Sequence, residues 1–287
     1  MIPVADVTNA ALAARAATFT YGGPSTNNAW SPLGTPQHQP LPYYRTDNPM
    51  PQGRPWGERD SWNTNYYTDT PNTGVTRYYD WNITKLQCSP DGVETTCLAV
   101  NGQVPGELIT ANWGDCPLLL GYKSTSAMPF PMRALPSTVI HWHGLLQKQT
   151  PFMDGVPGMT QCPIAPETCF TYRFQADLYG TTWYHSHYGS QYASGLVGPL
   201  VIYGPNNTAY DEDLGPVMIS DWYHEYYETV IDALLQPLPA VNIPMSDNNL
   251  INGKNSFNGN GAPMASFNFT SGKTYRLRLI NPSAAAV

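Results

Sequence analysis

The sequence has 287 residues, of which 14 are lysine or arginine, and it carries a formal net charge of -7 with a pI near 5.2. Binding to nucleic acid needs clustered basic residues, and no basic stripe is present, so we expect no nucleic-acid partner. No stretch approaches the ~20 consecutive apolar residues of a membrane span, so we expect no membrane partner. The 28 prolines, 24 glycines and 19 tyrosines favour short strands joined by tight turns, which predicts an all-β protein.

The N-terminal stretch, residues 1–65, is rich in proline, asparagine and tyrosine and has no sustained period, so we expect an extended arm that wraps a domain. We expect His38, within this arm, to be solvated. No signal peptide is visible, because the start has no apolar run of sufficient length. Glycosylation sequons at Asn82, Asn206 and Asn268 nevertheless fit a secreted, extracellular protein, although such triplets also arise by chance.

Strand-like patterns begin at Val75 and recur at close spacing, separated by turn signals such as Asn101-Gly102. The predicted strands are Val75–Ile83, Cys97–Val100, Leu108–Ala111, Thr138–Trp142, Phe170–Gln175, Trp183–Ser186 and Pro199–Tyr203. Together they suit one β-sandwich that closes near Gly204, so we assign residues 66–204 to a first domain.

A second domain is expected over residues 211–287. Val217–Asp221 is a predicted strand, and the residues from Tyr226 to Leu235 have the apolar spacing of an amphipathic helix. Pro237 would end that helix, and Lys273–Ile280 is a further predicted strand. These 77 residues, 211 to 287, are roughly half of what a second sandwich needs, so we expect a partial domain and a sequence that is cut short.

The five cysteines cannot all pair within the chain. Cys88 and Cys97 flank a Pro-Asp-Gly turn and could meet across a hairpin. No cysteine has a histidine beside it and none lies in a CxxC pair, so the sequence gives little support to a zinc knuckle or a thioredoxin-like site. We expect the cysteines to be structural.

Four of the six histidines lie in two short stretches, His141-Trp142-His143 and His185-Ser186-His187. Both stretches are rich in β-branched and aromatic residues, and on a strand residues i and i+2 point to the same face, with Cα atoms ~6.6 Å apart. Each pair therefore presents two imidazoles that can chelate one ion or straddle two, and imidazole suits copper, zinc, iron and nickel. Paired histidines can also simply face a core or an edge, but two such pairs in one chain favour a metal site.

The sequence also predicts the roles of three further residues. Trp142, between two candidate ligands, must point to the opposite face of its strand, so we expect it in the core. Asp154 belongs to an Asp-Gly dipeptide, which is a strong turn signal, and a carboxylate there is also a candidate for proton transfer. His224 is expected to be structural, packing or hydrogen-bonding near the start of the predicted helix.

Over about residues 52–281 the sequence resembles the N-terminal part of fungal laccase-like multicopper oxidases of the ascomycete type. The stretches that carry the resemblance are Asn65–Val75, Thr110–Asp115, His141–Lys148, Thr181–His187, Gly198–Gly204, Ser220–His224 and Leu250–Lys254. Their order and spacing make the match specific. The resemblance implies cupredoxin-like Greek-key β-sandwiches, one complete and one partial in this chain.

The resemblance also implies a cofactor and a reaction. Members of the family take electrons from phenols or similar small reductants at a type 1 copper and reduce dioxygen to water at a three-copper cluster. By resemblance His141 would bind the type 2 copper, and His143, His185 and His187 would bind the type 3 pair. Asp154 would lie near the water of the type 2 copper and relay protons. The other cluster ligands come from a C-terminal cupredoxin domain, and without a His-Cys-His in this sequence there is no type 1 site.

The sequence departs from the family in two places, and one matching cysteine would lack its partner. Cys116–Ser137 lacks a period of two and contains several prolines where the family has a strand, so we expect no strand there. Ala285 stands where similar oxidases carry an acidic residue that receives the phenolic proton. Cys162 aligns with a cysteine that the family pairs with the C-terminal region, so we expect a free thiol here.

The function we favour is therefore the copper-binding part of a laccase-like oxidase, with the chain alone inactive. One alternative is a non-catalytic cupredoxin module that binds copper or a partner without turnover. Another is a single-zinc or single-iron enzyme that uses the two His-X-His pairs, which is less favoured because no carboxylate motif accompanies them.

Overall fold

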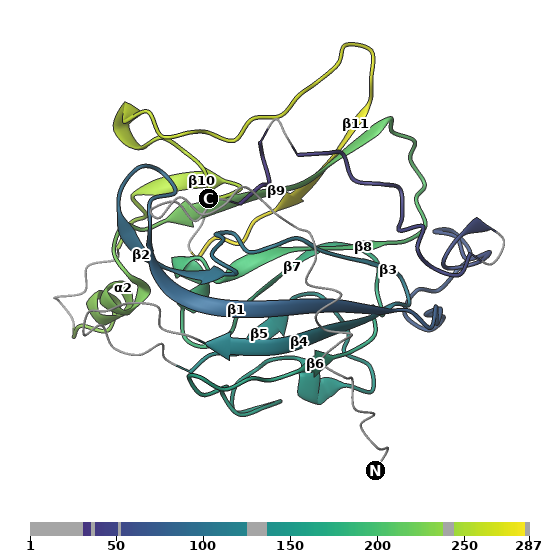
Figure 1. Cartoon of the computed structure of the whole chain (residues 1–287), viewed down its shortest axis with the longest axis horizontal. Helices are drawn as coiled ribbons and strands as arrows, with labels where there is room; N and C mark the ends of the chain where they lie inside the picture. Colours follow the sequence, from purple (N-terminus) through teal and green to yellow (C-terminus); the bar gives the residue numbers. More distant parts are fainter. Residues whose placement is uncertain (1–30, 36–37, 51–52, 125–136, 238–243, 285–287) are drawn as a thin grey trace, which may run out of the picture.

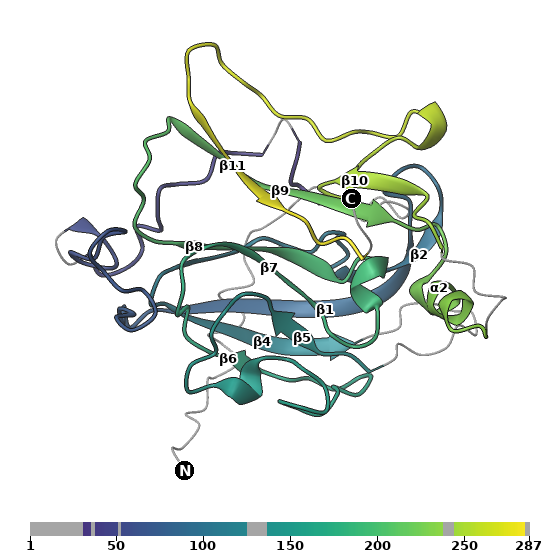
Figure 2. The ribbon, with the colours of Figure 1, turned by 180° about the vertical axis from the view of Figure 1, so that it is seen from behind.

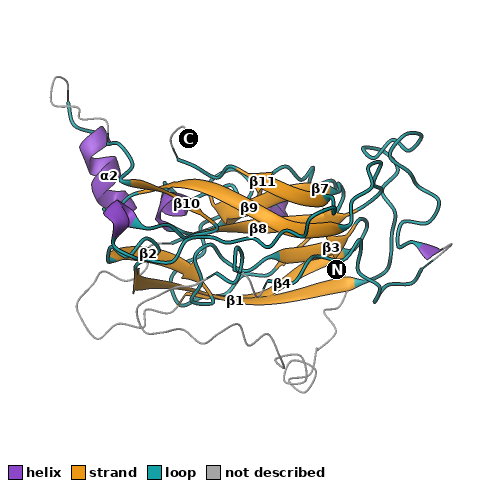
Figure 3. Cartoon of the chain, turned by 90° about the horizontal axis from the view of Figure 1, so that it is seen from above, coloured by secondary structure: helices purple, strands orange, loops and turns teal. Residues whose placement is uncertain are grey.

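The computed structural model describes residues 31–35, 38–50, 53–124, 137–237 and 244–284. In chain order its strands are β1 (Thr76–Cys88), β2 (Thr95–Val100), β3 (Ile109–Asn112), β4 (Cys116–Ser124), β5 (Ile140–Trp142), β6 (Tyr172–Arg173), β7 (Gly180–Ser186), β8 (Val197–Tyr203), β9 (Glu212–Trp222), β10 (Asn248–Ile251) and β11 (Tyr275–Ile280). The helices of the described residues are α2 (Tyr227–Leu234) and the 3-10 turns η2 (Pro151–Met153), η3 (Gln191–Ser194) and η4 (Phe257–Gly259). Strands make up the body of the molecule and α2 lies at one end, which confirms the all-β prediction (Figure 3).

Two four-stranded sheets enclose the main core. Their strand orders are β2-β1-β4-β6 and β3-β8-β7-β5, and neighbouring strands in both include parallel and antiparallel pairs. Large aromatic side chains fill the space between them, because alternate residues of each strand face inward. The Trp81 ring of β1, for example, lies 4.4 Å from the Tyr184 ring of β7, centroid to centroid. Trp142 is 1% exposed within this core, as predicted.

A third sheet, with the order β10-β9-β11, follows the sandwich in the chain. It lies beside β7 and β8 in both face-on views (Figures 1 and 2). Met218 of β9 and Ile280 of β11 pack with Val197 of β8 in a small apolar cluster. A buried ion pair joins β11 to β9, since Arg278 Nε donates to Asp213 Oδ2 at 2.9 Å.

The described part of the N-terminal arm runs along both the sandwich and the third sheet. Leu41 forms a β-bridge with Asp213 of β9, and the Arg45 backbone amide donates to the Asn112 side chain at 2.9 Å. At the far end, Lys254 Nζ donates to the Leu33 carbonyl at 2.6 Å and, at the same distance, to that of Ser31. Burial lowers the pKa of Lys254 to about 8. The arm is thus tied to distant parts of the chain.

Two expectations for individual segments are wrong. The backbone of Cys116–Ser124 forms β4, which pairs parallel with β1 and antiparallel with β6. A ladder needs only backbone groups in register, and Pro117 lies next to the start of the strand, where a missing N–H is tolerated. The remaining part of that prediction, residues 125–136, lies outside the described residues.

His38 is the second correction, because it is half-buried and not solvated. Its Nε2 is buried without a hydrogen-bond partner among the described residues, and burial lowers the pKa of the ring, as does the nearby Lys254 charge. The prediction failed because the arm packs against Gly215 in the β9 segment, a contact that depends on residues far away in sequence.

Two local predictions, the cysteine pair and the Asn101-Gly102 turn, are confirmed. Cys88 and Cys97 form a disulfide, with Cα atoms 6.1 Å apart. Asn101 and Gly102 both adopt positive φ, as a tight hairpin turn between β2 and the next segment requires. Of the described residues, none belongs to a helix long and apolar enough to cross a membrane.

Candidate metal centre

The four paired histidines lie at neighbouring ends of β5 and β7. These strands pair antiparallel, with His141 directly opposite His185 and Trp142 opposite Tyr184. Because side chains alternate across a strand, Trp142 and Tyr184 enter the core while the histidines gather on the other face of the sheet. The alternation expected from the two His-X-His stretches is therefore present.

The structure brings all four rings together. Potential ligand atoms of His141, His143 and His185 lie within 4.8 Å of one another. The His141 ring centroid is 5.3 Å from that of His185 and 5.4 Å from that of His187. His185 is 7% exposed, whereas His143 and His187 are exposed. The group of four histidines is thus buried on one side and open to solvent on the other.

Backbone carbonyls determine which nitrogen two of these rings offer. His141 Nδ1 lies 2.7 Å from the Asp154 carbonyl, and His185 Nδ1 lies 2.8 Å from the Ser186 carbonyl. A carbonyl can only accept, so Nδ1 carries the proton and Nε2 keeps its lone pair. Such a bond to the second ring nitrogen fixes the orientation and tautomer of metal-binding histidines.

The Asp154 turn reaches His141 because Gly155 follows it. Gly155 has a φ of +78°, and a Cβ at this position would lie 1.8 Å from the Ile140 carbonyl oxygen. Only a glycine permits this close approach of the turn to β5. One Asp154 carboxylate oxygen lies 3.3 Å from His141 Nδ1, and the carboxylate is a quarter exposed. The predicted turn is therefore present, and the Asp154 carboxylate lies beside His141.

Trp183 supports two of the rings from one side. Its indole stacks on His185 at 4.2 Å and on His143 at 4.8 Å between centroids. Tyr192 of η3 lies edge-on to His185 at 5.5 Å. These contacts limit the orientations of the imidazoles, since each ring has an aromatic neighbour against its face or edge.

The electrostatic environment favours the neutral form of His143 and His185. Burial, with a smaller contribution from the nearby histidines, lowers the pKa of His185 to about 4, although the hydrogen bond to the Ser186 carbonyl raises it. Burial and the charges of His141 and His187 also lower the pKa of His143. Neutral imidazole is the form that binds metal, so the donor set fits a transition-metal ion at neutral pH.

Two family models described as multicopper oxidase match residues 82–207 and 213–287. The chain belongs to the multicopper oxidase family. It is 43% identical over 240 residues to laccase-2 of Botryotinia fuckeliana, a match that covers 79% of this chain and 38% of that protein. It therefore spans less than half the length of that relative.

Solved structures agree with this assignment. The laccase from Botrytis aclada superimposes with a TM-score of 0.66 at 41% identity, covering 79% of this chain and 41% of that one. Fet3p, a multicopper oxidase that functions in iron import, gives 0.60 at 31% identity, covering 72% of this chain and 37% of that one. The chain shares the cupredoxin fold of these oxidases.

Membership in this family implies copper as the metal cofactor. The donor group among the described residues contains no carboxylate, because the Asp154 carboxylate lies behind His141, next to Nδ1. A single-iron or single-zinc site with a carboxylate ligand is therefore less well supported than copper.

Sequence reasoning missed two residues that shape the histidine cluster. Gly155 was part of a recognised Asp-Gly turn, but its contact with Ile140 joins segments that are separate in sequence. Trp183 lies two positions before His185 in the sequence. The alternation of side chains along a strand would therefore have placed it on the same face as His185.

Two other predicted residues lie apart from the histidines. His224 Nε2 lies 2.8 Å from Asp91 Oδ2, which agrees with its predicted structural role. Ala285, expected at the position of a substrate-binding acid, lies outside the described residues.

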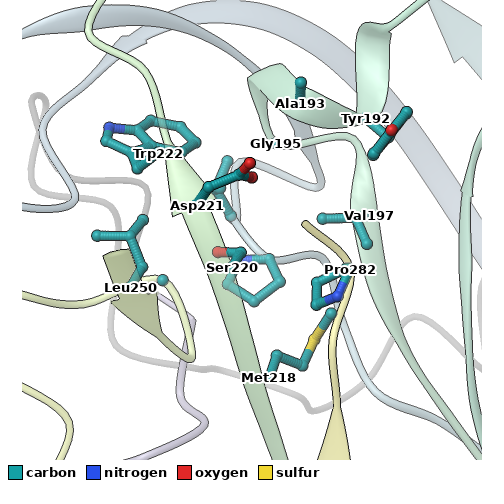
Figure 4. A pocket seen from close by; sticks show the side chains of 13 residues that line it. Tyr192, Ala193, Gly195, Val197, Met218, Ser220, Asp221, Trp222, Leu250 and Pro282 are labelled. Carbon is teal, nitrogen blue, oxygen red and sulfur yellow. The ribbon is translucent and has the colours of Figure 1, made fainter. Parts of the chain in front are cut away.

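A separate, small pocket lies between η3 and the third sheet (Figure 4). Asp221 and Trp222 of β9 face Tyr192 and Gly195 across it, and none of the four histidines lines it. Asp221 Oδ1 accepts a hydrogen bond from the Ala284 amide at 3.0 Å, so its carboxylate also holds the segment after β11.

Proposed function

We propose that this chain is the copper-binding part of a laccase-like multicopper oxidase that oxidises phenolic or similar small reductants and reduces dioxygen to water. In this proposal His141 binds the type 2 copper, and His143, His185 and His187 bind the type 3 pair. The observation that carries it is the convergence of His141, His143 and His185 within 4.8 Å, on a family member with this fold.

Bound copper would supply the one-electron chemistry on which the reaction depends. The protein's own contribution is to hold neutral rings in fixed orientations before the metal arrives. The Asp154 carbonyl accepts a hydrogen bond from His141 Nδ1, which leaves Nε2 as the ligand atom. Trp183 stacks on the rings of His143 and His185 and supports them. These contacts lower the cost of ordering the ligands.

Asp154 has a second role in the proposal. Its carboxylate lies beside His141 and remains partly exposed, so it can exchange protons with solvent. A carboxylate in that position can deliver protons towards the site where dioxygen is reduced. We propose Asp154 as the proton-relay residue.

The remaining parts of the reaction are proposed to lie outside these 287 residues. The sequence contains no His-Cys-His, so a type 1 copper and the other ligands of the cluster would come from a further cupredoxin domain. We propose that residues 66–204 form a first cupredoxin-like unit and 211–287 part of a second. We also propose an extracellular location, consistent with the Cys88–Cys97 disulfide.

One alternative function remains specific enough to test. The four histidines could bind copper in a module without turnover, since two of the rings are open to an incoming donor from another molecule. The oxidase proposal and this alternative differ in whether a C-terminal cupredoxin domain restores catalysis.

Copper titration and an oxidase assay test the proposal. The chain should bind Cu(II), followed by electron paramagnetic resonance, and His143→Ala or His185→Ala should weaken binding at least tenfold. His224→Gln is the matched control, because that histidine lies against Asp91 and away from the cluster. Equal weakening by all three substitutions would contradict the ligand assignment.

The chain alone should oxidise no phenol and show no intense blue band. Activity should appear when a C-terminal cupredoxin domain is supplied in trans, and His143→Ala should abolish it. Copper binding without any activity in the reconstituted protein would favour the non-catalytic module. Catalytic oxygen uptake by the chain alone would refute the proposal that a further domain supplies the type 1 copper and the other cluster ligands.

A further inference from the structure

A second cleft lies where the N-terminal arm meets the start of the third sheet. Its cavity volume is about 330 Å³, at the lower end of the range of roughly 300–1,000 Å³ typical of small-molecule sites. The arm and the β8–β9 connection run beside each other at this end of the molecule (Figures 1 and 2). The described residues that line it are Tyr43, Ser61, Tyr179, Gly180, Ile202, Tyr203, Gly204, Pro205, Asn206, Asn207, Tyr210, Arg276 and Arg278.

The cleft carries an uncompensated positive charge. None of the described residues that line it is acidic, in a chain whose net charge is -7. Arg278 is neutralised, because its guanidinium is bonded to Asp213 and also donates to Thr181 Oγ1 at 2.9 Å. Arg276 has no carboxylate within ion-pair distance among the described residues, so its guanidinium is available to an anion.

One aromatic ring lies close to this free guanidinium, and further rings line the same cleft. The Arg276 guanidinium carbon lies 5.4 Å from the Tyr210 ring centroid, and Tyr210 stacks on Tyr43 at 4.8 Å with an interplanar angle of 21°. The Tyr179 ring lies directly against the backbone at Gly204, where a Cβ would be 2.2 Å from the ring. Flat walls of this kind suit a planar ring.

We propose that this cleft binds a small planar aromatic carboxylate. Arg276 would hold the carboxylate through its paired N–H donors, since guanidinium and carboxylate match in geometry. The rings of Tyr43, Tyr179 and Tyr210 would cover the apolar body of the ligand. The amide side chains of Asn206 and Asn207 would add polar contacts at the rim.

This cleft is separate from the histidine cluster. Gly180, at its wall, begins β7, and His185 lies five residues further along the same strand. At ~3.3 Å per residue the two positions are ~17 Å apart. The proposal therefore does not depend on copper binding or on the oxidase reaction.

Calorimetry with three probes tests the proposal on the copper-free chain of 287 residues. The protein should be made without glycosylation, because Asn206 belongs to a sequon and lines the cleft. We expect benzoate to bind at least tenfold more tightly than benzamide, which lacks the charge, and than acetate, which lacks the ring. Equal affinities for benzoate and benzamide, or for benzoate and acetate, would overturn the proposal, as would an absence of benzoate binding at millimolar concentration.

A variant locates the binding. Arg276→Gln should lower benzoate affinity about tenfold, whereas Arg173→Gln, which alters an exposed arginine of β6, should leave it unchanged. Thermal unfolding of each variant checks that it folds. If Arg276→Gln does not fold, the comparison of the three probes on the unaltered chain still decides. Unchanged benzoate affinity in a folded Arg276→Gln protein would overturn the assignment.

Discussion

Replacing Gly155 with alanine is the sharpest test of how the chain positions His141. The added Cβ would lie 1.8 Å from the Ile140 carbonyl oxygen, whereas real Cβ contacts are at least 3.0 Å, so the turn must move by 1.2 Å or more. A displacement of that size along the Asp154–His141 hydrogen bond lengthens it from 2.7 to 3.9 Å, which breaks it.

The expected magnitude follows from these changes. Alanine at a φ of +78° costs about 1 kcal/mol, and the lost hydrogen bond with the displaced backbone costs about 2 kcal/mol more. Loss of the partner that orients a metal ligand typically lowers metal affinity by roughly 10- to 100-fold. We therefore expect Gly155→Ala to lose about 3 kcal/mol of unfolding free energy and at least tenfold in Cu(II) affinity.

Gly158→Ala is the matched control, because Gly158 lies in the same loop at a φ of +77° and a Cβ there has nothing within 4 Å. It should lose only about 1 kcal/mol and keep its copper affinity. Urea unfolding of the copper-free proteins and copper titrations measure both quantities. Equal effects of the two substitutions would refute the argument that close approach to β5, and not backbone strain alone, positions His141.

Three other predictions concern the copper-free chain. The pKa of His185 is about 4 in the folded chain, against an ordinary value near 6.5, so the unfolded chain binds more protons between these two pH values. Acidification from pH 6.5 to 4 should therefore lower the free energy of unfolding by up to about 3 kcal/mol. His185→Gln should flatten this pH dependence in urea unfolding. Asp213→Asn leaves the buried Arg278 guanidinium without its counter-charge and should cost about 3 kcal/mol, whereas a loss under 1 kcal/mol would show that the pair is solvated. Cys162 and Cys169 are exposed and free, so both should alkylate in the native state, and a peptide map showing a disulfide between them would contradict the structure.

The fold could be predicted where the decisive contacts are local. The positive φ values of Asn101 and Gly102 follow from the residue types themselves, and the shared face of each histidine pair follows from the alternation of side chains in a strand. The family resemblance added the prediction that the β-sandwich is cupredoxin-like.

Predictions failed where a segment's conformation is decided by distant partners. β4 exists because β1 and β6 lie on either side of it, and no pattern within Cys116–Ser124 reveals those neighbours. His38 is half-buried because the arm meets β9. The Asp154 carbonyl contacts His141 only because Gly155 approaches Ile140 closely. The separation of thirteen residues between His141 and Asp154 does not predict that approach.

The tie between the arm and Lys254 also bears on the order in which the chain assembles during synthesis. Leu33 and Lys254 are separated by 221 positions, so the ribosome must make most of the protein before this contact can form. At about 5–20 residues per second, the arm would wait on the order of 10 to 40 seconds for its partner. Through this interval the sandwich between β1 and β8 can already pack its core and bind the arm at Arg45, whereas the end of the arm at Ser31 and Leu33 stays undocked and accessible to proteases and chaperones. Docking of this end would then follow the synthesis of β10, which ends at Ile251, three residues before Lys254.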